Sequence, residues 1–232
     1  MKYIFTGGSG LLGQCMKHHF KYDLFPKRQE LDFTNLENVY DYLSKNNIST
    51  LIHMGAETNT VGTENNKEVT LNSLKTNIVG TCNLVEVCSK LDIKLIYIST
   101  DYVFNGEKEV GEYYYPHDDL NPINKYGWSK LGGECAVRMY DNSLIIRTSF
   151  CENFFKYKKA FIDQWTTRDT VYNTSIKIKK AIIEGKKGIV HVGSDVPKSI
   201  YELAKELSPH VEIEPISRTE VYPIPRNTSL KN

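Results

Sequence analysis

Short runs of apolar residues recur along this 232-residue chain, and longer amphipathic stretches separate them. The runs are rich in β-branched and aromatic residues and too short for helices, so they predict buried strands. The predicted strands are Met1–Thr6, Thr50–Met54, Lys94–Ser99, Ser143–Thr148 and Gly188–Val192.

The stretches between these runs carry apolar residues at helical spacing. The predicted helices are Leu11–Phe20, Asn35–Lys45, Thr70–Leu91, Pro122–Met139, Thr170–Glu184 and Ser199–Leu207. We expect Thr34 to be the N-cap of the second helix. The apolar residues of the second helix are Val39, Tyr40 and Leu43. In the helix Thr70–Leu91 the residues expected to face the core are Leu74, Ile78, Leu84 and Val87. Alternating strands and helices predict an α/β fold, a doubly wound parallel sheet with a ligand site at its carboxyl edge.

A glycine-rich turn joins the first predicted strand to the first predicted helix. Gly7, Gly10 and Gly13 have the spacing G-x-x-G-x-x-G. Glycines at this spacing allow a tight turn, close approach of the backbone to a diphosphate and packing of the helix on the strand. The start of the helix, with Leu11 and Leu12, then faces the phosphates with free N–H groups. We therefore expect a dinucleotide cofactor at this turn.

A second pattern places a tyrosine and a lysine together. Tyr126 and Lys130 are four residues apart in a predicted helix and therefore share one face. We expect the Lys130 ammonium to lower the pKa of Tyr126 toward working pH. Tyr126 is then a candidate proton donor to a carbonyl, with the Thr100 hydroxyl beside it. This spacing often occurs by chance, and its combination with the glycine turn makes it specific.

The residues after the first helix bear on the choice of cofactor. An acid about 20 residues after the glycines usually binds the ribose 2′-hydroxyl of NAD. Asp23 comes too early for that position, whereas Lys27 and Arg28 lie near it. Two cations suit a 2′-phosphate, which favours NADP(H). A solvated basic turn is the other interpretation, and it leaves NAD(H) open.

Together these motifs resemble the extended short-chain dehydrogenases/reductases, and among them most closely the dTDP-4-dehydrorhamnose reductase family. The resemblance covers roughly residues 1–149, with a weaker match in Pro225–Leu230. Ser99–Gly106, which reads Ser-Thr-Asp-Tyr-Val-Phe-Asn-Gly, is its most family-specific segment. The other matching segments are Thr6–Gly13, Glu30–Thr34, Leu51–Ala56, Tyr126–Glu134 and Leu144–Ser149.

The resemblance implies a Rossmann domain in residues 1–150 and a small, shortened substrate-binding lobe in residues 151–232, partly interleaved with it. It implies NAD(P)H-dependent reduction of the C4 carbonyl of a nucleotide-linked 4-keto-6-deoxy sugar, of the dTDP- or UDP-4-dehydrorhamnose type. The implied catalytic residues are Thr100, Tyr126 and Lys130. The expected cofactor contacts are Gly7, Gly10, Leu11, Leu12, Gly13, Arg28, Asp32, Phe33, Ala56, Tyr126 and Lys130.

The expected substrate contacts are Asp101, Phe150, Arg168 and Arg226. Phe150 stands where the family has a tryptophan, and the two arginines are candidates for the substrate diphosphate because a planar guanidinium suits phosphate. The aromatic side chains of the lobe either cover a nucleoside base or pack a small core. They are Phe154, Phe155, Phe161 and Trp165.

Other function classes stay open. One relative of the family binds NADP and regulates a partner enzyme, which makes a binding subunit an alternative. A sugar-nucleotide epimerase or epimerase-reductase needs a further acid/base pair, for which Cys151 and Lys159 are candidates. Sugar 4,6-dehydratases place an Asp-Glu pair after the threonine, and Tyr102 in place of that glutamate argues against elimination chemistry.

Two polar residues in predicted elements have more than one interpretation. His53 lies inside a predicted strand, where a hydrogen-bonded core histidine is the expected role. Asn77 lies in the long predicted helix. It either supports Lys130 and its proton transfer or is an ordinary polar residue of the helix.

The composition of the chain argues against several classes of binding partner. The formal charge of +1 gives no field that attracts nucleic acid or an anionic membrane. There is no apolar run of about 18 residues, the length a membrane span needs, and no signal-peptide pattern. The five cysteines form no C-x-x-C pair, which favours a reducing cytoplasm and argues against zinc. We expect a small-molecule substrate and no metal. The sequence leaves the oligomeric state open, and a homodimer is one of the alternatives.

Overall fold

Five parallel strands form the central sheet of the computed structural model, which describes residues 2–218 and 223–232. The strand order is β1-β2-β3-β4-β9, and every neighbouring pair is parallel. The strands are β1 (Tyr3–Thr6), β2 (Thr50–His53), β3 (Lys94–Thr100), β4 (Ser143–Thr148) and β9 (Gly188–Val192). The prediction of a parallel α/β sheet is confirmed. Met1, included in the first predicted strand, lies outside the described residues.

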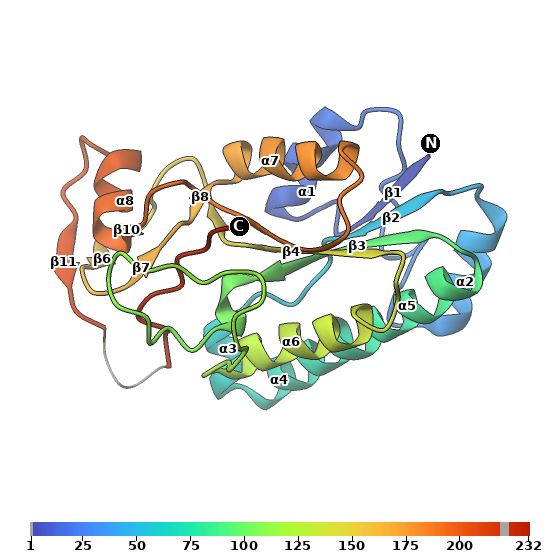
Figure 1. The fold of residues 1–232 in the computed structure, drawn as a ribbon, viewed down its shortest axis with the longest axis horizontal. Helices are drawn as coiled ribbons and strands as arrows, with labels where there is room; N and C mark the ends of the chain where they lie inside the picture. Colours follow the sequence, from blue (N-terminus) through green and yellow to red (C-terminus); the bar gives the residue numbers. More distant parts are fainter. Residues whose placement is uncertain (1, 219–222) are drawn as a thin grey trace.

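Helices cover both faces of this sheet (Figure 1). On one face lie α1 (Leu11–His19) and α7 (Val171–Ile183). The opposite face carries α2 (Leu36–Lys45), α5 (Gly80–Lys90) and α6 (Lys125–Val137). A separate apolar cluster fills each interface, because strands buried on both faces are apolar along their whole length.

The predicted helix over residues 70–91 is longer and less regular than its sequence suggested. It begins as α4 (Lys67–Ser73), widens into the π-helical turn η1 (Leu74–Val79) and continues as α5. The Asn66 side chain caps it by accepting hydrogen bonds from the backbone N–H groups of Glu68 and Val69. Leu74 is 51% exposed, so its predicted place in the core is wrong. A π-helical turn shifts the phase of the helix, and an extrapolated 3.6-residue period therefore fails across it.

The predicted N-cap of helix α2 (Leu36–Lys45) is also wrong. Asn35, not Thr34, caps α2, because the Asn35 side chain accepts from the backbone N–H of Asn38. Thr34 instead donates its hydroxyl to Asp32. Tyr40 is 46% exposed, although Val39 and Leu43 of the same helix are buried in the core. The short helix α3 (Thr60–Asn65) had no sequence prediction.

A small lobe lies beyond one end of the sheet (Figure 1). Its elements are β6 (Lys159–Phe161), β7 (Trp165–Thr166), β10 (Lys198–Ser199), α8 (Ile200–Leu207) and β11 (Glu214–Ile216). Ala160, Ile200, Ala204 and Ile213 form its apolar core. Between these elements the chain returns to the sheet through β8 (Asp169–Thr170), which pairs with β5 (Phe150–Cys151), and then α7 and β9. The division of the chain at residue 150 into two domains stays a prediction.

Residues 223–232 run back along the body of the protein and connect segments far apart in sequence. The Asn227 side chain donates to the carbonyls of Glu109 and Glu112. The backbone N–H of Tyr114 donates to the carbonyl of Ser229, and that of Thr228 donates to the carbonyl of Trp165. Asn227, Thr228 and Ser229 are almost fully buried. This segment therefore joins the loop after β3 to the lobe. None of the described helices is long and apolar enough to cross a membrane.

Candidate active site

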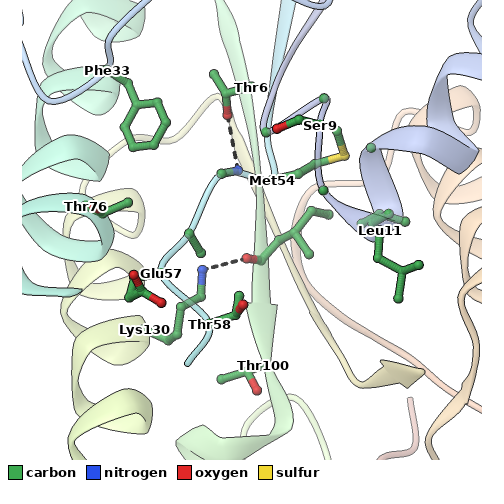
Figure 2. Close-up of a pocket in the computed structure, with 18 of the residues that line it drawn as sticks. Thr6, Ser9, Leu11, Phe33, Met54, Glu57, Thr58, Thr76, Thr100 and Lys130 are labelled. Atoms are coloured by element: carbon green, nitrogen blue, oxygen red, sulfur yellow. Dashed lines mark hydrogen bonds between the residues drawn. The ribbon is translucent and has the colours of Figure 1, made fainter. Parts of the chain in front are cut away.

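A cavity of about 1110 Å³ lies at the carboxyl ends of β1 to β4. Thr6, Thr100 and Thr148 mark the ends of three of these strands and all line it. Figure 2 shows Thr100 and Lys130 near each other, with Leu11 of α1 across the cavity. The cavity therefore joins the glycine turn to the predicted catalytic residues, at the edge of the sheet where the sequence predicted a ligand.

The glycine turn has the geometry of a diphosphate cradle. Gly7 has a φ of 73°, and a side chain there would bring its Cβ within 2.6 Å of the backbone nitrogen of Gly55. At Gly13 a Cβ would lie 2.4 Å from the carbonyl oxygen of Gly7, so only glycine permits this approach of helix to turn. Helix α1 begins after Gly10 without a side-chain cap. Its first N–H groups are therefore available to an anion at the cavity.

Buried hydroxyls extend the polar lining of the cavity. Ser99 and Thr148 are buried and line it, and neither hydroxyl has a hydrogen-bond partner among the described residues. Buried polar groups in folded proteins are nearly always hydrogen-bonded. A glycine cradle at one end and unpaired hydroxyls at the strand ends fit a polar, phosphate-bearing cofactor.

Helix α6 brings the predicted catalytic pair to this cavity. The Asn124 side chain caps it by accepting from the backbone N–H of Gly127, at 2.8 Å. One turn apart, Tyr126 and Lys130 both line the cavity, as does Thr100 at the end of β3. Lys130 is 3% exposed and donates from Nζ to the carbonyl of Ile98 at 2.9 Å. The three candidate catalytic residues therefore meet in one place.

The electrostatics of this group differ from the sequence prediction. Burial raises the pKa of Tyr126, the nearby Asp101 carboxyl raises it further, and a hydrogen bond with Thr100 partly offsets both. Burial lowers the pKa of Lys130 to about 7, and Glu134 opposes that shift. The prediction that Lys130 lowers the pKa of Tyr126 is wrong. Desolvation by burial is the largest cause of the pKa shift of each residue, and it raises the pKa of Tyr126. Tyr126 is thus protonated at neutral pH, the form a proton donor needs.

A buried carboxyl and an arginine form the other end of the cavity. Asp101 is 1% exposed, and burial raises its pKa while Arg168 and hydrogen bonds from Thr228 and Thr100 oppose that rise. Arg168 donates from Nε to the Ser149 hydroxyl at 2.8 Å. Asp101, Phe150 and Arg168 all line the cavity, as expected for residues that contact a substrate.

The residues expected along the cofactor also line the cavity. Arg28, Asp32, Phe33 and Ala56 do so, and so does Lys27. The Nε of Arg28 lies 3.8 Å from a carboxylate oxygen of Asp32, four residues further on. Asp23, rejected as a ribose ligand from its position in the sequence, accepts the backbone N–H of Tyr3 instead.

Several candidate substrate residues lie elsewhere. Arg226 is not among the residues that line the cavity; its guanidinium donates to Glu109 at 2.6 Å. The same holds for Cys151 and Lys159, the candidate acid/base residues of an epimerase. Among the aromatic residues of the lobe, Phe155 and Phe161 pack against the lobe core, and Phe154 is 58% exposed.

His53 is a core histidine, as the sequence indicated. It is 1% exposed, and its two ring nitrogens contact the hydroxyls of Thr6 and Thr81 at 2.7 and 3.2 Å. Asn77 has a structural contact that the sequence did not predict. Its side chain accepts from the backbone N–H of Glu57 and donates to the Glu57 carbonyl, at 2.8 and 3.0 Å. It thereby fixes the loop after β2, whose Ala56 and Glu57 line the cavity.

Some cavity residues had no specific sequence prediction. Ser99, Tyr102, Thr148 and Ser149 line the cavity from the ends of β3 and β4. Their only signal was position, since each stands at or just beyond the carboxyl end of a predicted strand. In the described parts of the chain, 2–218 and 223–232, no group of three His, Cys, Asp or Glu residues is arranged to hold a metal ion.

A parallel sheet with a glycine turn at its first strand and a Thr–Tyr–Lys group in the same cavity defines an extended short-chain dehydrogenase/reductase. The family profile described as "RmlD substrate binding domain" matches residues 1–172. The chain belongs to this family.

Relatives of known sequence include reductases and a subunit of another enzyme. A probable low-salt glycan biosynthesis reductase of Haloferax volcanii is 35% identical over 62% of this chain and 52% of its own length. The dTDP-4-keto-6-deoxy-D-glucose reductase of Streptomyces niveus is 26% identical over 88% of this chain and 76% of its own. Methionine adenosyltransferase 2 subunit beta of Bos taurus is 24% identical over 99% of this chain and 80% of its own. The chain thus spans about half of the first of these proteins and more of the others.

Solved structures agree over the whole chain. A dTDP-4-dehydrorhamnose reductase of Clostridium acetobutylicum superposes with a TM-score of 0.89 and 25% identity, covering 100% of this chain and 90% of that one. The dTDP-4-dehydrorhamnose reductase of Bacillus anthracis, solved in complex with NADP, gives a TM-score of 0.87 and 26% identity over 99% and 89% of the two chains. The sequence resemblance to this family is therefore confirmed.

Proposed function

We propose that this protein is an NAD(P)H-dependent reductase that converts the C4 carbonyl of a nucleotide-linked 4-keto-6-deoxy sugar to an alcohol. One observation carries the proposal: Thr100, Tyr126 and Lys130 line the same cavity as the glycine turn. Membership of a family whose named relatives include such reductases supports it. The substrate is a small molecule carried on dTDP or UDP, and we place the reaction in the cytoplasm.

The side chains of the cavity have complementary roles in this reaction. NADP(H), when bound, supplies the hydride. Tyr126 donates its proton to the carbonyl oxygen, on which negative charge develops. Thr100 donates a hydrogen bond to the same oxygen and stabilises that charge. Lys130, one helical turn from Tyr126 on the same face of α6, holds the cofactor ribose.

The remaining cavity residues orient the reactants. The glycine turn and the start of α1 hold the cofactor diphosphate. Lys27 and Arg28 hold the 2′-phosphate of NADP(H), the favoured cofactor, and Asp32, Phe33 and Ala56 lie along its adenosine half. Asp101, Phe150 and Arg168 face the sugar nucleotide. Arg226 has no part in this proposal, because its guanidinium is ion-paired with Glu109 outside the cavity lining.

Oxidation of NADPH in the presence of a dTDP-linked 4-keto-6-deoxy sugar tests the proposal directly. The wild-type protein should oxidise NADPH and form the 4-hydroxy product, with the UDP-linked sugar tested in parallel. Tyr126→Phe removes one hydroxyl and should lower turnover by roughly 10²–10⁴-fold while cofactor affinity changes little. A Tyr126→Phe protein with full activity would falsify the role of Tyr126 as proton donor.

A second candidate is an NADP-binding regulatory subunit. The similarity to methionine adenosyltransferase 2 subunit beta over 99% of this chain favours it. This alternative predicts NADPH binding without oxidation for every sugar nucleotide tried. It also predicts that Tyr126→Phe, Lys130→Ala and Thr100→Val leave the regulated property of a partner unchanged.

A further inference from the structure

The carboxyl of Asp101 has a partner far away in the sequence. The Thr228 hydroxyl donates to Oδ2 of Asp101 at 2.6 Å, a contact between residues 127 positions apart. Thr228 is 1% exposed. Asp101 is the cavity residue next to Thr100, and Thr228 is absent from the cavity lining. Among the hydrogen bonds of the described residues, Thr228 reaches the cavity lining through Asp101.

Each oxygen of this carboxyl accepts a hydrogen bond, one from the adjacent residue and one from a residue far away in the sequence. Oδ1 accepts the hydroxyl of Thr100 at 3.1 Å, while Oδ2 accepts that of Thr228. The only other hydroxyl at Oδ2 among the described residues is that of Thr166, at 3.5 Å, which is a weak contact. An aspartate that accepts a bond on each oxygen is fixed about its terminal torsion. Thr228 thus sets the plane of the carboxyl and, with it, the contact to Thr100.

The backbone around Thr228 is fixed independently of this bond. The N–H of Thr228 donates to the carbonyl of Trp165, and the N–H of Leu230 donates to the hydroxyl of Thr167. The next residue, Ser229, is fully buried, and its hydroxyl has no partner in the part of the chain that the structure describes. Neighbouring positions therefore carry one hydroxyl that bonds to Asp101 and one that has no hydrogen-bond partner among the described residues.

We propose that Thr228 is a positioning residue, which holds the Asp101 carboxyl so that Thr100 and Asp101 face the substrate in one orientation. This inference rests on the reductase function proposed above. Without the Thr228 hydroxyl, Oδ2 of a buried carboxyl loses its short hydrogen bond. The carboxyl is then free to turn, and the Thr100 hydroxyl loses its fixed neighbour.

Steady-state kinetics of four proteins test the proposal: wild type, Thr228→Val, Thr228→Ser and Ser229→Ala. Thr228→Val should lower kcat by roughly tenfold or more, as expected for loss of a hydrogen bond to a charged group, while the affinity for NADPH stays within about twofold. Thr228→Ser keeps the donor and should recover most of the activity. Ser229→Ala removes a buried hydroxyl of the same kind and should match wild type. If Thr228→Val does not fold, Thr228→Ala makes the same deletion with a smaller side chain.

Failure of this inference is distinguishable from failure of the proposed function. If Tyr126→Phe is inactive and Thr228→Val turns over like wild type, Thr228 has no positioning role and the reductase proposal stands. If Thr228→Ser loses as much activity as Thr228→Val, or Ser229→Ala loses as much, the role of Thr228 is structural only.

A second readout does not depend on turnover. The ¹³C resonance of the Asp101 carboxyl, followed against pH, reports its titration in each variant. The charged or titratable groups that face this carboxyl are Arg168, Tyr102 and Tyr126. Since the Thr228 bond favours the ionised form, Thr228→Val should raise the pKa of Asp101, and neither Thr228→Ser nor Ser229→Ala should do so. An unchanged titration in Thr228→Val would overturn the inference even if the protein has no reductase activity.

Discussion

The Thr100 hydroxyl is both a donor and an acceptor in the cavity. It contacts Asp101 at 3.1 Å, and its oxygen accepts the backbone N–H of Tyr102 at 3.2 Å. In the proposed reaction its single proton turns from Asp101 to the developing oxyanion. Thr100→Val keeps the shape of the side chain and removes the donor. We expect kcat to fall by about 10²-fold with little change in NADPH affinity, which stopped-flow turnover and fluorescence titration would measure. An equal loss in binding and in turnover would contradict this role.

The cations after α1 should decide the cofactor. Lys27 and Arg28 line the cavity, although Arg28 is partly neutralised by Asp32. NADPH should bind more tightly than NADH, and the paired change Lys27→Ala and Arg28→Ala should reduce that preference by roughly 10- to 100-fold. Calorimetric titration of both cofactors with both proteins measures the difference. A preference that survives in the double variant means that other groups hold the 2′-phosphate.

We expect the buried Lys130 side chain to lower the free energy of unfolding at neutral pH. Its pKa of about 7 lies below the usual value of 10.5 because the ammonium is buried. Between these two pH values the unfolded chain binds a proton that the folded protein does not, so this group destabilises the fold at pH 7 and the penalty fades as pH rises toward 10.5. Lys130→Met should raise the free energy of unfolding by about 1–3 kcal/mol at pH 7, allowing for the lost bond to Ile98.

Urea unfolding of wild type and Lys130→Met at pH 7 and pH 10 checks the sign. The advantage of the variant should shrink at the higher pH, and its reductase activity should be lost at both. A variant less stable than wild type at pH 7 would show that the bond from Nζ to the Ile98 carbonyl outweighs the cost of burying the charge.

Among the elements, β9 couples the sheet to residues 223–232. His191 of this strand contacts the carbonyls of Tyr114 and Lys231 through Nδ1, and the side chain of Asn232 bonds to its backbone N–H and carbonyl. Burial and the neighbouring Arg147 lower the pKa of His191 to about 4. Between pH 6.5 and 4 the unfolded chain therefore gains a proton that the folded protein does not, and stability falls as the pH falls, by up to about 3 kcal/mol.

His191→Asn keeps a donor near the position of Nδ1 and removes the titrating ring. Its stability should change less than that of wild type over this pH range, whereas the exposed His210→Asn should behave like wild type. Thermal unfolding followed by circular dichroism from pH 7 to pH 4 measures both. Parallel pH curves for wild type and His191→Asn would show that other groups cause the acid sensitivity.

Elements differ in how far their sequences predict them. The five central strands were predicted because buried parallel strands are apolar throughout, a signal that needs no knowledge of their neighbours. The π-helical turn at Leu74–Val79 was not predicted, and its phase shift left Leu74 exposed. Asn77 lies within that turn and bonds to Glu57, 20 residues earlier, a contact that no local pattern contains.

For the whole molecule, the sequence identified the cavity residues of the glycine turn and α6 more readily than the contacts around Asp101. The glycine turn, Tyr126 and Lys130 lie in local motifs with fixed spacing. The contacts around Asp101 come from Thr100, Thr166 and Thr228, and ordinary threonines at such separations have no recognisable pattern. Arg226 is the opposite case: its place in a family segment suggested a ligand contact, and its guanidinium pairs with Glu109.

The contact between Thr228 and Asp101 also sets an order of events during protein synthesis. A ribosome adds roughly 5–20 residues per second, so the 127 residues that separate the two positions take on the order of 6–25 seconds to make. Before that interval ends, the ribosome has made the four sheet strands up to Thr148. The Asp101 carboxyl still lacks this donor at that stage. A nascent chain can therefore gather the elements of its cofactor cradle first, and it completes the partners of Asp101 only once residue 228 has been translated.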